Sequence, residues 1–200
     1  MLNPRTTQDP CVRSRLPASV WRATRMLAAA AAAGCLFACS PALDWRQAGP
    51  KEVDILLDFP CKPLTVTQPV MLAGKRVAMS MTGCKAADMT FALAHADLGD
   101  PSLVAPALAE MHRAALANVS ARVLASQPAH VTHASEGLAD ALQLDLAGQA
   151  PGGQALREHV LLFAQGSQVF QATVLGQQAH YKRDAAHMFA SSVRLGAAPD

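Results

Sequence analysis

The chain has 200 residues, of which 51% are hydrophobic and 16% are charged, and its formal net charge at pH 7 is +2. The excess of base lies in the first 38 residues, which hold five arginines and one aspartate. Of the 17 bases and 15 acids in the whole chain, 12 bases and 14 acids then remain, so the rest of the chain carries a charge of −2. A nucleic-acid partner requires a clustered basic face. The sequence has no such cluster outside its first residues, and we expect no nucleic-acid partner.

The N-terminal region has the three parts of a secretory signal peptide in their usual order. Residues 1–25 are positively charged, residues 26–37 form an uncharged run rich in alanine and leucine, and a small residue then precedes Cys39. A membrane-spanning helix needs about 20 apolar residues, and the run after Arg25 is shorter than that. The pattern therefore favours a cleaved leader over an uncleaved membrane anchor, which stays as an alternative. The charged region is long, so a translation start nearer Met26 also stays open.

The end of this leader, Leu36-Phe37-Ala38-Cys39, resembles the lipobox of bacterial lipoproteins. In that family the cysteine thiol is diacylglycerated and the cysteine becomes the new N-terminus. Phe37 is larger than the residue usual at its position, and Ala32-Ala33-Gly34-Cys35 is a competing box with Cys35 as the acylated residue. Plain secretion after cleavage near Ala38 is a further alternative.

The resemblance to lipoproteins implies a division of the chain and a place in the cell. Residues 1–38 are then a signal peptide, residues 39–51 a lipidated N-terminus and tether, residues 52–196 a folded domain, and residues 197–200 a tail. Ser40 after the acylated cysteine is similar to the signal for the outer membrane, where aspartate would favour the inner membrane. We expect a membrane-anchored envelope protein that faces the periplasm.

The five cysteines sort by position. Cys11 and Cys35 belong to the leader and Cys39 is the expected lipidation site, which leaves Cys61 and Cys84. An even pair in an oxidising compartment predicts a disulfide bond. A redox CxxC motif needs two intervening residues, and a zinc site needs further ligands at short spacing, so both are weaker interpretations.

The domain shows strand patterns, then a helix, then strands and a second helix. Residues 77–81 alternate between large and small side chains, as a half-buried strand does, and Gly74-Lys75 is the expected turn before them. Asp100-Pro101 is a helix start signal, with Asp as the N-cap and Pro at the first helical position. We expect strands at residues 53–59, 69–73, 76–81, 89–96, 138–147, 155–164 and 168–175, and helices at 100–125 and 181–192.

Hairpin-length links between these elements predict an α+β domain, with an antiparallel sheet and two main helices packed on it. Phe59-Pro60 after the first strand, the helix after Asp100-Pro101, the strand pair at residues 160–163 and 169–174, and the closing Met188-Phe189-Ala190-Ser191-Ser192-Val193 resemble the PsbP-like (Mog/PsbP) fold. The resemblance covers roughly residues 52–195 and extends to small envelope lipoproteins of unknown function. It implies a binding or accessory role and fixes no ligand.

A search for catalytic and metal-binding patterns yields no site in the sequence. His130 and His133 are the only close histidine pair, and with only Glu136 nearby they are typical of a polar loop. Gly166-Ser167 lacks the second glycine and the following helix of a nucleophile elbow. We expect the methionines and phenylalanines to form the core, and Trp45 to lie at the membrane interface or to cap the domain edge.

The sequence therefore predicts an exported, lipid-anchored envelope protein that is not an enzyme and has no cofactor or metal. A periplasmic enzyme whose site is assembled from distant residues is the alternative. Such an enzyme would show a polar pocket that holds a titratable group with a perturbed pKa.

Overall fold

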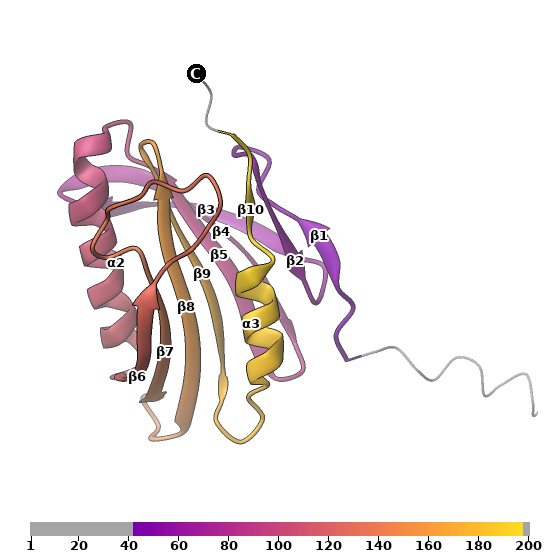
Figure 1. Cartoon of the computed structure of the whole chain (residues 1–200). Coiled ribbons are helices and arrows are strands. Elements are labelled where there is room, and N and C mark those ends of the chain that lie inside the picture. The colour runs from indigo at the N-terminus through magenta and orange to yellow at the C-terminus, as the bar shows by residue number, and fades with distance from the viewer. Residues whose placement is uncertain (1–41, 198–200) are drawn as a thin grey trace, which may run out of the picture. The chain divides into compact units, whose positions relative to one another are not determined.

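The computed structural model describes residues 42–197, which fold into three layers (Figure 1). A seven-stranded antiparallel sheet with strand order β3-β4-β5-β9-β8-β7-β6 forms the middle layer. Helix α2 covers one face of this sheet, and helix α3 covers the other face together with a small sheet of order β1-β2-β10. This arrangement confirms the expected α+β class with an antiparallel sheet and two main helices.

Most elements follow one another through short links, as predicted, whereas residues 129–141 form a longer loop between β6 and β7. None of the helices within residues 42–197 has the length and apolar character that a membrane crossing requires. The bounds are β1 Arg46–Ala48, β2 Ile55–Phe59, β3 Leu64–Leu72, β4 Lys75–Ala86, β5 Met89–Asp97, the 3-10 helix η2 Pro101–Leu103, α2 Val104–Asn118, β6 Arg122–Pro128, β7 Leu142–Gln149, β8 Ala155–Gln165, β9 Gln168–Gln177, α3 Arg183–Ser191 and β10 Arg194–Leu195.

The long helix expected at residues 100–125 is wrong in its last seven residues, 119–125. Asp100 caps the start as expected, because its Oδ1 accepts a hydrogen bond from the Ser102 backbone N–H at 2.9 Å. However, α2 ends at Asn118, the chain reverses at Ser120 with a φ of 46°, and Arg122–Pro128 forms the edge strand β6. Apolar residues at helical spacing continue past the reversal, so the periodicity alone could not locate it.

Five other features differ from the sequence prediction. Strand β3 starts at Leu64 and includes Pro69, which an edge strand tolerates because one side of it needs no backbone donor. The β3–β4 turn is Ala73-Gly74, both with positive φ, as two-residue hairpin turns require. Strand β7 begins at Leu142, four residues later than expected, and α3 begins at Arg183. Arg46–Ala48 pairs with β2, so part of the expected tether belongs to the small sheet.

The core between α3 and the sheet is aromatic. Phe189 of α3 contacts Phe59 of β2 and Phe91 of β5, with ring centroids 5.1 and 5.5 Å apart in edge-to-face geometry. Phe163 and Phe170 stack on neighbouring strands with centroids 5.0 Å apart. All five rings are fully buried, which confirms the expected aromatic core.

The methionines divide between the core and the surface. Met89 and Met111 are buried, whereas Met71, Met81 and Met188 are about half exposed or more, so the expectation that all the methionines form the core is wrong. Trp45 packs edge-to-face on Phe91 with centroids 6.1 Å apart, which agrees with its expected role at the domain edge.

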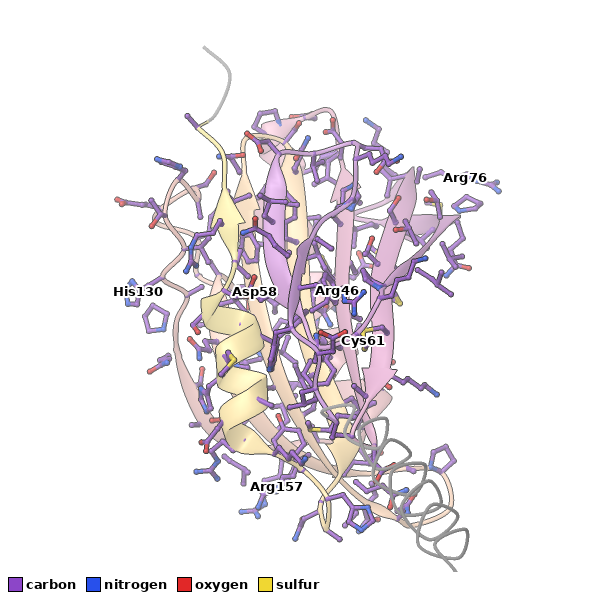
Figure 2. All side chains as sticks on the ribbon, turned by 90° about the vertical axis from the view of Figure 1, so that its right-hand side faces the viewer. Arg46, Asp58, Cys61, Arg76, His130 and Arg157 are labelled. Carbon is purple, nitrogen blue, oxygen red and sulfur yellow. A yellow bond between two sulfur atoms is a disulfide. The ribbon has the colours of Figure 1, made fainter. Side chains whose placement is uncertain are left out.

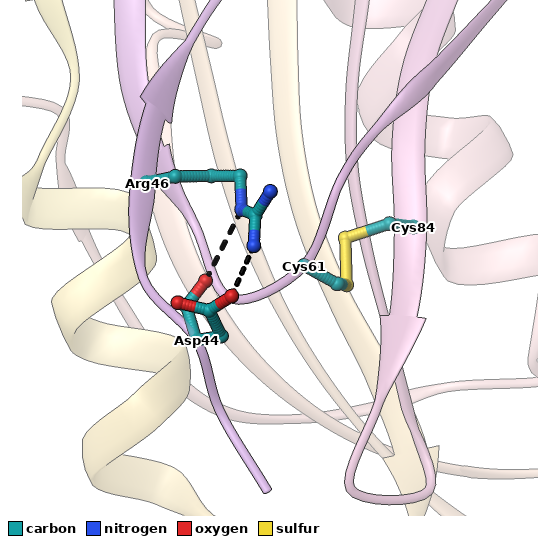
Figure 3. Close-up of a disulfide and its surroundings, with 4 residues drawn as sticks. All are labelled: Asp44, Arg46, Cys61 and Cys84. Carbon is teal, nitrogen blue, oxygen red and sulfur yellow. Dashed lines mark hydrogen bonds and ion pairs between the residues drawn. A yellow bond between two sulfur atoms is a disulfide. The ribbon is translucent and has the colours of Figure 1, made fainter. Parts of the chain in front are cut away.

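The disulfide expected between Cys61 and Cys84 is present (Figure 3). It joins the loop after β2 to strand β4, and the two Cα atoms are 6.0 Å apart. Beside it, the Arg46 guanidinium donates to the Asp44 carboxylate just before β1. The disulfide therefore links the small sheet covalently to the large sheet.

The end of α2 is held against β7 at Gly148. A Cβ atom at this position would lie 2.1 Å from the Val119 carbonyl oxygen, which accepts a hydrogen bond from the Gln149 backbone N–H at 2.8 Å. Only glycine allows the two backbones to approach this closely. By contrast, a Cβ atom at Gly152 in the β7–β8 turn would meet nothing within 4 Å.

We predict that Gly148→Ala lowers the free energy of unfolding by about 1–3 kcal/mol, the usual cost of inserting a methyl group into filled space. Gly152→Ala is the matched control and should change stability by less than about 0.5 kcal/mol. Urea denaturation followed by circular dichroism measures both variants. Equal stabilities of the two variants would contradict the close packing at Gly148.

We predict that loss of the disulfide lowers the free energy of unfolding by about 3 kcal/mol, because the bond closes a loop with a sequence separation of 23 in the unfolded chain. Denaturation with and without reductant measures the loss. The double variant Cys61→Ala and Cys84→Ala should show the lower stability in both conditions. A protein whose stability is the same with and without reductant would argue against the bond.

Candidate functional site

A buried pair of polar side chains lies between α3 and the large sheet. Asp145 on β7 and His159 on β8 are direct partners in the strand register. Because Leu144 and Leu146 pack toward α2, the alternation of β7 directs Asp145 toward α3. The His159 side chain is only 1% exposed, while that of Asp145 is 28% exposed. The pair therefore lies at the margin of the aromatic core, open to solvent through the carboxylate.

The hydrogen bonds of His159 fix its tautomer. Its Nδ1 lies 2.8 Å from Asp145 Oδ1, and an ionised carboxylate only accepts, so Nδ1 carries the proton. Its Nε2 lies 3.1 Å from the side-chain amide nitrogen of Gln143, which donates to it. Burial lowers the pKa of His159, and the hydrogen bond to Asp145 partly opposes this shift. The imidazole is therefore neutral at neutral pH, and both of its ring nitrogens have hydrogen-bond partners.

Helix α3 adds a second imidazole to this pair. The ring centroid of His187 lies 4.6 Å from that of His159, at an interplanar angle of 54°. One potential ligand atom from each of Asp145, His159 and His187 lies within 4.8 Å of the other two. A carboxylate oxygen and two imidazole nitrogens are donors that divalent transition metals accept. Within residues 42–197 this is the one cluster of three such side chains at that separation.

Two depressions flank the cluster along α3. A groove of about 510 Å³ is lined by His130, Gln143, Asp184 and His187, so it reaches the His187 side of the cluster. A smaller cavity of about 160 Å³ on the other side is bordered by Asp145, Arg157, Glu158, Tyr181 and Arg183. Figure 2 shows His130, which lines the groove, to one side of α3. It shows Arg157, which borders the smaller cavity, below the helix.

Two buried polar atoms at the smaller cavity have no hydrogen bond, within residues 42–197, to offset the loss of their hydration. Glu158 Oε2 and the Tyr181 hydroxyl have no hydrogen-bond partner among the residues that the structure describes. Burial raises the pKa of Glu158 to about 7 and raises the pKa of Tyr181 above its usual value. Unpaired buried polar groups cost free energy, so both groups favour a water or a polar ligand in this cavity.

The histidine pair considered in the sequence does not form a site. His133 Nδ1 lies 3.0 Å from the backbone oxygen of Leu195, and His130 instead borders the groove beside α3. The sequence patterns did not indicate the cluster of Asp145, His159 and His187. A turn centred on Gly152 in the expected hairpin would have placed Asp145 opposite His159, but no local pattern links either residue to His187.

The expected processing residues lie outside the part of the chain that the structure describes. These are the signal peptide at residues 1–38, the lipidation site Cys39 with its competitor Cys35, and Ser40. The tail residues 198–200 also lie outside it.

Comparison with known proteins gives likeness in structure alone. No protein-family model matches the chain. No curated protein matches it. Among solved structures, the chain is similar to the solution structure of cyanobacterial PsbP (CyanoP) from Synechocystis sp. PCC 6803, with 10% sequence identity and a TM-score of 0.43 over 80% of this chain and 99% of that chain. The PsbP-like resemblance of the sequence thus has a counterpart among solved structures, and a likeness at this level carries no inference about function.

We predict that Glu158→Gln stabilises the protein at pH 8. The pKa of Glu158 is about 7 in the folded state, against an ordinary value of 4.5, so its contribution to the free energy of unfolding falls as pH rises from about 4.5 through 7. Glutamine removes the cost of burying the charge, a gain of about 1–3 kcal/mol at pH 8 that shrinks toward zero near pH 4. Urea denaturation at both pH values measures it.

The exposed Glu136 in the loop before β7 provides the control. Glu136→Gln should leave the pH dependence of stability as it is in the wild type. A Glu158→Gln variant that is less stable than the wild type at pH 8 would show that the ionised carboxylate is stabilised in the fold.

Proposed function

We propose that this chain is an exported binding protein of the cell envelope, held to the membrane by a lipid on Cys39 and facing the periplasm. The lipobox-like sequence before Cys39 supports the anchor, and Ser40 supports the outer membrane. The disulfide between Cys61 and Cys84 is consistent with an oxidising compartment. The proposal assigns the protein an accessory role without catalysis.

The groove beside α3 is the observation that carries the binding role. It combines polar side chains, namely His130, Gln143, Asp184 and His187, with the apolar Leu161 and Met188. Ligand sites are concave and place a small number of polar groups in a largely apolar wall. The groove lies on the rigid face between the helix and the large sheet, so a bound ligand would meet a preformed surface.

The short distance between Cys39 and β1 supports a site close to the membrane. Seven residues separate Cys39 from Arg46, the first residue of β1. A fully extended chain of that length spans at most about 25 Å, which is less than the length of a typical domain. A lipid on Cys39 would therefore hold the folded domain against the membrane surface.

An enzyme is the second candidate, and the pair of Asp145 and His159 favours it. A carboxylate that orients a buried histidine is the support that a general base needs. In a hydrolase, Nε2 of that histidine faces a nucleophilic hydroxyl or thiol. Here the amide of Gln143 occupies that position at 3.1 Å, and an amide is no nucleophile in such a triad. The geometry therefore supports binding better than catalysis.

We predict that Cys39→Ser releases the protein from the membrane fraction of its native host or leaves it unprocessed. The wild type should have an intact mass that corresponds to a chain beginning at Cys39 with a lipid attached. Cys35→Ser is the matched control and should be processed and anchored like the wild type. Detergent partitioning and mass spectrometry measure both properties.

Each contrary result has a distinct meaning. If the Cys35→Ser protein is released and the Cys39→Ser protein stays anchored, the lipid is attached to Cys35. A wild-type protein that keeps residues 1–38 would replace the lipid anchor with an uncleaved one, and a soluble wild type without lipid would indicate plain secretion.

A further inference from the structure

We propose that Asp145, His159 and His187 together bind one divalent transition-metal ion, with zinc as the ion that suits the three ligands. The inference names a ligand for the binding role proposed above and rests on that role for its setting in the cell. It depends on the juxtaposition of three side chains from β7, β8 and α3, whose potential ligand atoms all lie within 4.8 Å of one another.

The ligand set matches zinc in its chemistry. Zinc accepts imidazole nitrogens and carboxylate oxygens at about 2.0–2.2 Å in a tetrahedral arrangement, which places neighbouring ligand atoms about 3.4 Å apart. Asp145 Oδ1 and His159 Nδ1 already lie 2.8 Å apart, and one ligand atom of the half-buried His187 lies within 4.8 Å of one atom of each partner. The metal takes the place of the proton at His159 Nδ1. The imidazole then carries its proton on Nε2, where the Gln143 amide accepts it through its oxygen after the amide turns over.

The surroundings support a bound cation in a further way. The Gln143 side-chain amide lies 3.1 Å from His159 Nε2, the ring nitrogen remote from Asp145. A metal-bound histidine usually gives its outer N–H to a polar group that fixes the orientation of the ring. The Gln143 amide can accept that hydrogen bond through its oxygen when His159 binds the metal through Nδ1.

Three protein ligands leave a fourth position of the tetrahedron for another group. His187 forms part of the wall of the groove that also contains His130 and Asp184. The fourth position is thus open to water or to an exchangeable ligand from the groove. Closed four-ligand sites are structural, so this arrangement fits reversible binding of the metal better than a permanent structural role.

A matched pair elsewhere in the protein separates a metal site from an ordinary Asp–His hydrogen bond. His112 on α2 lies 2.8 Å from Asp140, the same separation as in the pair of Asp145 and His159. No third ligand joins it among residues 42–197. His112→Ala therefore removes an equivalent imidazole without touching the proposed site.

Titration calorimetry with Zn²⁺ on the untagged full-length protein in detergent tests the proposal, with Co²⁺ absorption as a second measurement. We expect one saturable site per chain in the wild type and in His112→Ala. We expect His187→Ala to weaken it by about 100-fold or more, because loss of an outer partner of a ligand alone costs about 10–100-fold. Circular dichroism checks that each variant is folded, and Asp145→Asn provides a second variant that conserves side-chain shape.

The proposal is overturned if no saturable site exists, or if folded His187→Ala and Asp145→Asn bind Zn²⁺ as the wild type does. Unchanged binding in both variants would assign the metal to the N-terminal cysteines or to other surface groups. The result is independent of the anchor, because the Cys39→Ser protein tests membrane attachment, and its release or retention does not bear on zinc binding by residues 145, 159 and 187.

Discussion

The burial of Phe189 between Phe59 and Phe91 is the contact on which the other layers depend. One ring belongs to α3, one to the small sheet and one to the centre of the large sheet, and all three are fully buried. Fully burying a phenylalanine contributes about 1.5–3 kcal/mol, and edge-to-face pairs add about 0.5–1.5 kcal/mol each. Because α3 is held at this point, its polar face comes to rest over Asp145 and His159. The site thus depends on the aromatic core beneath the same helix.

Much of the fold could be predicted from local sequence patterns, and the errors of that prediction have a physical cause. The hairpin of β8 and β9 and the strand β5 were expected nearly at their observed bounds, since Gly166 and Asp88 in their turns are residue types that tolerate a positive φ. The sequence failed where tertiary pairing overrides periodicity. Val123 and Leu124 continue the apolar spacing of α2, but they lie on the edge strand β6 and are about 40% exposed. Pairing of β6 with β7 decides their structure, and no local signal encodes it.

The candidate site was less predictable than the fold because its parts are far apart in the chain. Asp145 and His159 face each other across a hairpin of two expected strands, so half of the site was within reach of register reasoning. His187 lies on α3, which follows β9 in the chain. The angle at which α3 crosses the sheet sets the position of His187. Glu158 and Tyr181 carry no sign of their burial in the sequence, since their neighbours along the chain are polar as well as apolar.

The lipid anchor proposed at Cys39 would give the disulfide a mechanical consequence. Tension applied at Cys39 would reach β1 first and then β2, which are joined to the rest of the domain by hydrogen bonds and packing. At Cys61 the covalent bond to Cys84 would pass the load directly to β4 in the large sheet. The twenty-two residues from Cys39 to Cys61 could extend to about 75 Å at most. The disulfide thus would limit the distance between Cys39 and the seven-stranded sheet for as long as that sheet stays folded.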